Sequence, residues 1–137
     1  MSEAPPFSLS FLLAVALGSA AGGVARYLLT RVVQDRIDVA FPYGTLAVNI
    51  LGCLLLGVIL QAALSSGRMS EATQLLLTTG FCGGFTTFST FSYEGVRLIQ
   101  DGAWPRAFGY VGVSVVAGLG AFWLGTAAVR TLVGASS

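Results

Sequence analysis

Long apolar stretches fill almost the whole chain and constrain its fold more than any other feature. Of the 137 residues, 55% are hydrophobic and 9% are charged, whereas soluble domains carry roughly 25% charged residues. A helix needs about 20 apolar residues to cross the hydrocarbon core of a bilayer. Four stretches meet this requirement, at about residues 9–29, 43–64, 73–98 and 104–129. We therefore expect one all-α integral membrane domain over residues 1–137, with four transmembrane helices.

Several function classes are disfavoured by what the sequence lacks. The short connections leave no room for a soluble catalytic domain, and the chain contains no histidine. Cys53 and Cys82 both fall within expected spans and lack the spacing of zinc, haem or redox motifs, so we expect small buried hydrophobic residues at both positions. We expect neither an enzyme nor a nucleic-acid partner. The N-terminal tail has no Lys or Arg, which favours a retained first span over a cleaved signal peptide.

The distribution of arginines gives only a weak signal for orientation in the membrane. With four spans, two arginines would lie on one side and four on the other: Arg68 and Arg130 against Arg31, Arg36, Arg97 and Arg106. Cytoplasmic loops usually carry a clear excess of positive charge. Either the chain has a modest preference for one orientation, or it inserts in both and pairs as an antiparallel dimer. Four short helices enclose little space, which favours a second copy.

The third stretch contains the segment GFCGGFTTFSTF, which is unusual for a plain membrane helix. Gly80, Gly83 and Gly84 precede the β-branched pair Thr86 and Thr87. This combination favours a local interruption of the helix at mid-membrane, although close glycine packing alone is an alternative. An unwound segment in lipid must be buried in protein or line a polar cavity. Because its free carbonyls can coordinate a small cation, the pattern predicts an ion there.

Aromatic rings and hydroxyls follow the expected interruption. Phe88 and Phe91 are three residues apart and share a helix face. They either face lipid or core, or they hold their positive ring edges toward a path for an anion. Hydroxyls between them, such as that of Ser89, can donate hydrogen bonds to the same anion. Weak, multiple sites of this kind suit an ion that must leave as easily as it enters.

Polar residues in the other stretches are candidate partners. Asn49 has Thr45 four residues earlier on the same face. Asn49 either forms a hydrogen bond between helices or donates its amide hydrogens to an anion. Tyr110 and Ser114 are four residues apart in the last stretch and form a short polar line. Arg26 lies near the end of the first stretch, where it can snorkel, and we expect a structural or vestibule role for it.

Three segments together resemble the signatures of the Fluc (CrcB) fluoride channels: GGVARY, PYGTLAVNILG and GFCGGFTTFSTFSYEG. The similarity covers essentially the whole chain. It implies a dual-topology, antiparallel homodimer with two separate fluoride paths and a structural sodium ion, not transported, at the dimer centre. It also implies passive, fluoride-specific export that lowers cytoplasmic fluoride, by a multi-pass protein of a bacterial inner membrane.

The resemblance also implies roles for individual residues. The backbone carbonyls of Gly83 and Thr86 would bind the sodium ion. The fluoride path would be formed by Phe88 and Phe91 as edge-on rings, Asn49 as an amide donor, Tyr110 and Ser114 as a polar track, and Thr45 and Ser89 as further contacts.

Two other functions are alternatives to a channel. A small multidrug-type, proton-coupled transporter is also a four-helix, dual-topology dimer, but it needs a carboxylate deep in the membrane. The acid within the expected spans is Glu94, near the end of the third, where it could instead pair with an arginine. A non-transporting scaffold would use its glycines and Asn49 for packing alone.

Overall fold

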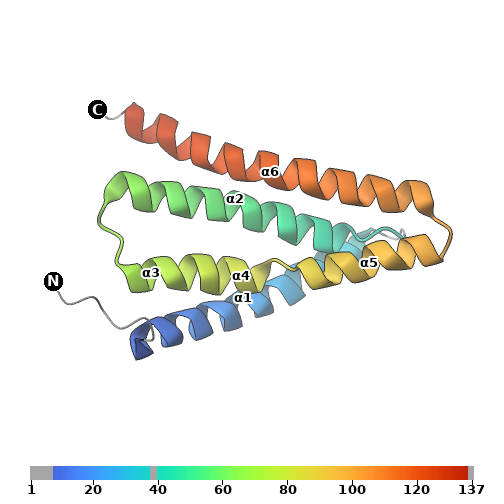
Figure 1. Cartoon of the computed structure of the whole chain (residues 1–137), viewed down its shortest axis with the longest axis horizontal. Helices are drawn as coiled ribbons and strands as arrows, with labels where there is room; N and C mark the ends of the chain where they lie inside the picture. The colour runs from blue at the N-terminus through green and yellow to red at the C-terminus, as the bar shows by residue number, and fades with distance from the viewer. Residues whose placement is uncertain (1–7, 38–39, 136–137) are drawn as a thin grey trace.

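The computed structural model describes residues 8–37 and 40–135, and helices form all of the regular structure in these ranges. The elements are α1 (Leu9–Arg36), α2 (Tyr43–Ser66), α3 (Glu71–Leu75), the π-helix η1 (Leu76–Cys82), α4 (Gly83–Phe85), α5 (Phe88–Gln100) and α6 (Trp104–Gly134). The chain runs back and forth along one long axis, so that α1 begins and α6 ends at the same end of the molecule (Figure 1). The expected all-α class is confirmed.

Within the described residues, three helices are long and apolar enough to cross a membrane: α1, α2 and α6. The third apolar stretch is divided into shorter pieces, and its longest uninterrupted α-helix, α5, has 13 residues. Because a spanning helix needs about 20 residues, no single piece of this stretch meets the length on its own.

Local signals set the connections between the helices. Gly67 ends α2 in the left-handed conformation with φ 59°, which glycine adopts without strain. Ser70 caps the next helix by accepting a hydrogen bond from the Thr73 amide. Gly102 has φ 74° in the last turn, and Pro105 follows in the first turn of α6.

Glycines bring α1 into backbone contact with the first half of the third stretch. A Cβ on Gly18 or on Gly22 would overlap a carbonyl oxygen of η1, which for Gly22 is that of Phe81. On the opposite side, a Cβ on Gly84 would lie 2.6 Å from the Ser19 carbonyl oxygen. Small residues at such positions let two membrane helices approach closely. Glycine packing therefore accounts for part of the GFCGGF segment.

The helices α2 and α6 lie side by side and pack through glycines in the same way (Figure 1). A Cβ on Gly57 would overlap the carbonyl oxygen of Phe122, and one on Gly125 would overlap that of Leu54. Together with α1, this pair forms the frame against which the third stretch is held.

The interruption predicted in the third stretch is confirmed, but it lies at the threonines and not at the glycines. Gly83 keeps helical angles, φ −63° and ψ −40°. Thr86 and Thr87 are extended, with φ −87°, ψ 160° and φ −150°, ψ 115°. Gly80 and Gly84 stay helical and pack closely on α1, and Gly83 stays helical although no atom of α1 lies within 4 Å of a built Cβ. The two β-branched residues suit extended backbone.

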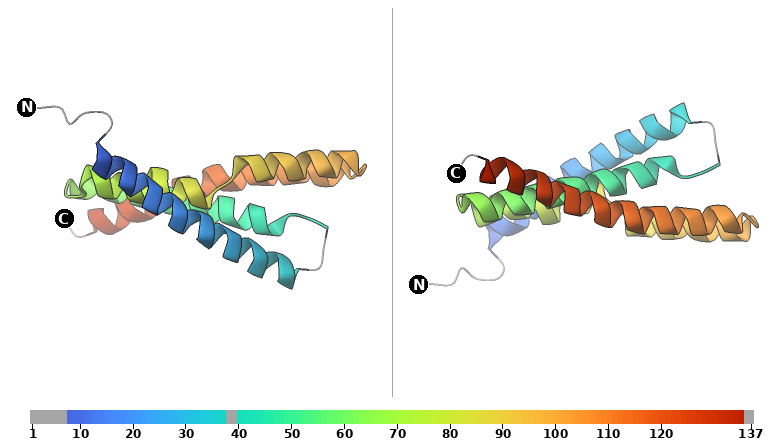
Figure 2. Two further views of the ribbon diagram at one scale, coloured as in Figure 1. Left: turned by 90° about the horizontal axis from the view of Figure 1, so that it is seen from below. Right: turned by 90° about the horizontal axis from the view of Figure 1, so that it is seen from above.

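The interruption lets the two halves of the third stretch pack on different helices. The half before the break, α3 to α4, contacts α1, whereas α5 contacts α6. Figure 2 shows α1 and α5 diverging beyond the break. Both halves also contact α2, which therefore spans the break from the other side.

Substitution of Gly22 tests the close contact between α1 and η1. Gly22→Ala places a methyl group against the Phe81 carbonyl, and we expect a loss of about 1–3 kcal/mol of stability from overpacking. The neighbouring Gly23 has no atom within 4 Å of a built Cβ, so Gly23→Ala is the matched control. Thermal melting in detergent should show a lower midpoint for Gly22→Ala only. Equal midpoints for both variants would contradict the contact.

Candidate functional site

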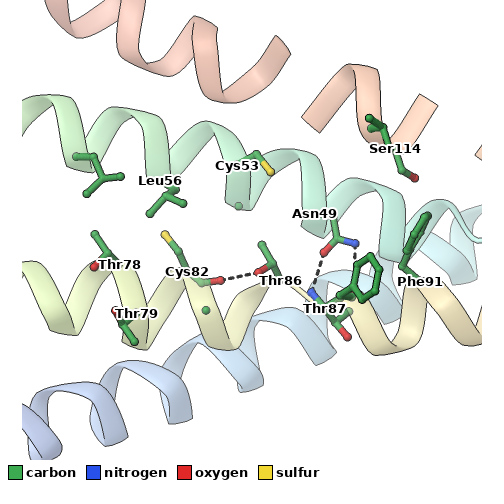
Figure 3. A pocket seen from close by; sticks show the side chains of 15 residues that line it. Asn49, Cys53, Leu56, Thr78, Thr79, Cys82, Thr86, Thr87, Phe91 and Ser114 are labelled. Carbon is green, nitrogen blue, oxygen red and sulfur yellow. Dashed lines mark hydrogen bonds between the residues drawn. The ribbon is translucent and has the colours of Figure 1, made fainter. Parts of the chain in front are cut away.

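The side chain of Asn49 in α2 is bound to the backbone of the break. Its Nδ2 donates to the Thr87 carbonyl at 3.1 Å, and the Thr87 amide donates to its Oδ1 at 2.8 Å (Figure 3). In a continuous helix the Thr87 amide would donate to the carbonyl of Gly83, four residues earlier. Asn49 thus replaces the helical partner of Thr87 and leaves the Gly83 carbonyl without its helical donor. Of the two roles considered for Asn49, the hydrogen bond between helices is present.

The side chain of Thr87 caps the second half of the broken helix. Its Oγ1 accepts a hydrogen bond from the Thr90 amide at 3.2 Å, and threonine is a favoured residue at this N-cap position. In a continuous helix the same amide would donate to the Thr86 carbonyl. The cap therefore removes the helical donor of a second carbonyl.

The Thr86 carbonyl has a partner from α1. Arg26 Nη1 donates to it at 3.2 Å in a part-buried contact. A positive charge beside the last carbonyls of a helix is favourable because these carbonyls carry the negative end of the helix dipole. Arg26 was expected near the end of its span, where it could snorkel, but α1 continues to Arg36 and Arg26 contacts the break instead.

A cavity of about 560 Å³ lies between α2, α6 and the broken helix. Six of the predicted fluoride and sodium contacts line it: Asn49, Gly83, Thr86, Phe88, Phe91 and Ser114. Figure 3 shows Asn49, Phe91 and Ser114 near one another at the end of this cavity where the helix is broken. Among the described residues, the Ser114 Oγ is buried and has no hydrogen-bond partner, so its hydroxyl is available to a ligand.

The two phenylalanines lie together at the start of α5. Their ring centroids are 5.5 Å apart with an interplanar angle of 44°. Phe91 also lies 5.1 Å from the ring of Tyr110. Phe88 is 79% exposed in the single chain, so most of its ring is not covered by its own subunit.

Three of the predicted fluoride contacts do not line the cavity: Thr45, Ser89 and Tyr110. Thr45 Oγ1 donates to Glu94 Oε1 at 2.8 Å, and the Tyr110 hydroxyl donates to Glu94 Oε2 at 2.7 Å. Ser89 is exposed, and its hydroxyl lies 3.2 Å from that of Thr87. Glu94, expected as a possible partner of an arginine, accepts from two hydroxyls instead.

Sequence reasoning missed this carboxylate network because its members come from three different elements, α2, α5 and α6. No spacing along the chain links them. The only available signal was the presence of polar residues at the same end of three apolar stretches.

The two cysteines match the expectation of small buried residues only in part. Cys82 is buried as expected, whereas Cys53 is partly exposed and both line the cavity. The described ranges contain no group of three or more His, Cys, Asp or Glu side chains that could hold a metal ion.

The chain matches a family model described as "CrcB-like protein, Camphor Resistance (CrcB)" over residues 13–126. A relative from Geobacter sulfurreducens, named "Fluoride-specific ion channel FluC", is 48% identical over 124 residues, which cover 90% of this chain and 100% of the relative. A protein of the same name from Trichlorobacter lovleyi is 46% identical over 86% of this chain and 94% of its own length. "Fluoride-specific ion channel FluC 1" of Streptomyces avermitilis is 48% identical over 85% of this chain and 93% of its own length. Because the family model and these relatives cover most of the sequence, the chain belongs to the CrcB-like protein family.

Proposed function

We propose that the protein is a fluoride-specific channel that lets fluoride leave the cell passively and so lowers its cytoplasmic concentration. The relatives named above carry the name of a channel and not of an enzyme, and they match nearly the full chain. The observation that carries the proposal is the convergence of the Asn49 amide, the unpartnered Ser114 hydroxyl and the rings of Phe88 and Phe91 at one cavity.

In this proposal the chain crosses the membrane four times, and the segment from α3 to α5 forms the remaining span. Large apolar side chains cover the outer faces of the long helices, such as Leu17, which is 65% exposed, and Trp123, which is 67% exposed. Exposed apolar surface of this extent marks contact with a membrane or another chain. The matched relatives named above are bacterial proteins, which supports a location in the inner membrane of a bacterium.

We further propose an antiparallel, dual-topology homodimer. The Phe88 ring is largely uncovered within one subunit, although it borders the cavity. Gly83 is exposed in the single chain and its carbonyl has no helical donor, so without a second copy this carbonyl would be left to the lipid, which is unfavourable. A second chain would cover the ring and close the cavity, and the small arginine bias described above permits insertion in both orientations.

Fluoride would lose its water shell gradually along this cavity. Asn49 has two amide hydrogens and uses one on Thr87, so the other can donate to the ion. The Ser114 hydroxyl and the positive edges of the two phenylalanine rings would supply the remaining contacts. No charged side chain of the described residues lines the cavity, and weak sites allow the ion to move on.

Thr45, Ser89 and Tyr110 remain proposed contacts further along the path. The hydroxyls of Thr45 and Tyr110 donate to Glu94 in the single chain. To meet an anion they would have to turn away from this carboxylate. We therefore assign them a secondary role, outside the cavity.

A structural sodium ion is proposed at the carbonyls of Gly83 and Thr86. Both carbonyls have lost their helical donors, because the Thr87 amide donates to Asn49 and the Thr90 amide to the Thr87 hydroxyl. Main-chain oxygens freed in this way suit a hard cation. Two chains would supply four such oxygens, and the ion would tie them together without being transported.

Fluoride efflux from liposomes tests the proposed function. Vesicles loaded with potassium fluoride and treated with valinomycin should release fluoride rapidly when they contain the protein, and vesicles loaded with potassium chloride should release little chloride. Equal release of both halides would contradict a fluoride-specific channel. No release of either would favour a scaffold, and proton-coupled uptake of organic cations would favour the multidrug-type transporter.

Substitution of the phenylalanines tests the role of the ring edges. Phe88→Ile and Phe91→Ile keep apolar bulk but remove the ring quadrupole. We expect each to slow fluoride efflux by about tenfold or more, equivalent to about 1.4 kcal/mol, while the dimer elutes unchanged. Phe108→Ile is the control, because Phe108 is 69% exposed on α6 and does not line the cavity. Unchanged efflux in both pathway variants would exclude the ring-edge mechanism.

A further inference from the structure

Arg26 continues the face of α1 that packs on the broken helix. The buried residues of this helix are Ala14, Gly18 and Gly22, at intervals of four. Residues four apart lie on the same face of a helix, so Arg26 occupies the next position along it. The small residues meet the helical half of the third stretch, and the arginine comes where that half ends. This face of α1 therefore packs closely on the third stretch before the break and forms a hydrogen bond to it at the break.

The arginine supplies the donor that the break removes. The Thr86 carbonyl lacks its helical partner because the Thr90 amide is capped by the Thr87 hydroxyl. The Arg26 guanidinium donates to this carbonyl at 3.2 Å. It reaches the carbonyl from α1 and does not line the cavity. Each subunit thus satisfies one of its two freed carbonyls with a cation of its own.

A sodium ion at the same carbonyl would lie close to this charge. Cations such as calcium bind oxygen at about 2.3–2.6 Å, and a sodium ion of similar size would then lie within about 6 Å of the guanidinium. Arginine stays charged at any relevant pH, and a part-buried pair of charges is only weakly screened by salt. An antiparallel pair of chains would place two such charges around one ion.

We propose that Arg26 has two effects at the break. Its hydrogen bond holds the Thr86 carbonyl within each subunit, and its positive charge weakens the binding of sodium to that carbonyl. This inference rests on the proposed sodium site. The repulsion acts on the sodium ion directly, whereas the hydrogen bond affects the ion only through the orientation of the carbonyl. The charge therefore dominates, and Arg26 sets the sodium concentration at which the assembled protein is saturated.

Sodium titration of thermal stability tests this role. Melting of the detergent-solubilised dimer is followed as sodium replaces N-methyl-D-glucamine at constant ionic strength. Arg26→Gln removes the charge and keeps an amide donor, and its half-saturating sodium concentration should fall by about tenfold or more, equivalent to about 1.4 kcal/mol. Arg26→Lys keeps the charge and should stay within about threefold of the unsubstituted protein, a difference below 1 kcal/mol on the same scale. Arg31→Gln is the matched control, because Arg31 lies on the same helix, is exposed and pairs with Asp35.

The possible outcomes separate this inference from the proposed function. An unchanged or higher half-saturating concentration in Arg26→Gln would overturn the inference, and so would the absence of any sodium response in both this variant and the unsubstituted protein. If Arg26→Gln does not assemble, Arg26→Lys decides, because a tenfold fall in a variant that keeps the charge would overturn the role of charge. Fluoride efflux from liposomes, measured in parallel on the unsubstituted protein, reports whether the channel proposal itself stands.

Discussion

The paired hydrogen bonds between Asn49 and Thr87 stabilise the break in the third stretch, and the positions of both half-helices follow from that break. They satisfy an amide and a carbonyl that an unwound segment would otherwise leave exposed. In a bilayer each unsatisfied backbone group costs several kcal/mol, which normally forbids such a segment. One asparagine on a neighbouring helix removes two of these costs at once. The break is therefore stabilised by Asn49 of α2, and the glycines that precede it are not its cause.

The break places the ends of two half-helices at one point. The first half remains on the glycine face of α1, where Gly18 and Gly22 admit its backbone, and the second half turns toward α6. The carbonyls of Gly83 and Thr86 lose their helical donors there, and the rings of α5 begin within a few residues. The proposed cation site and the proposed anion path would thus adjoin each other. No charged side chain of the described residues lines the cavity.

Composition alone predicted the helical class and the approximate position of the apolar stretches, because both depend on residue type. The pair Thr86 and Thr87 after several glycines also indicated the interruption. Contacts between distant segments could not be predicted in the same way: Arg26 lies sixty residues before its partner Thr86. Close packing and a freed backbone both remained open for the glycines, since composition does not distinguish a glycine that packs from one that frees the backbone. Asn49 was recognised as a polar residue within an apolar stretch, but its partner depends on how α2 docks against the break.

The conformation of Thr86 and Thr87 in Asn49→Leu is the sharpest test of whether Asn49 holds the break open. Leucine has nearly the shape of asparagine but can neither donate nor accept a hydrogen bond. Carbon-13 chemical shifts of labelled threonines report whether each residue is helical or extended. We expect extended values for both residues in the unsubstituted protein and a shift toward helical values in Asn49→Leu. Extended values that persist unchanged in the variant would contradict this expectation.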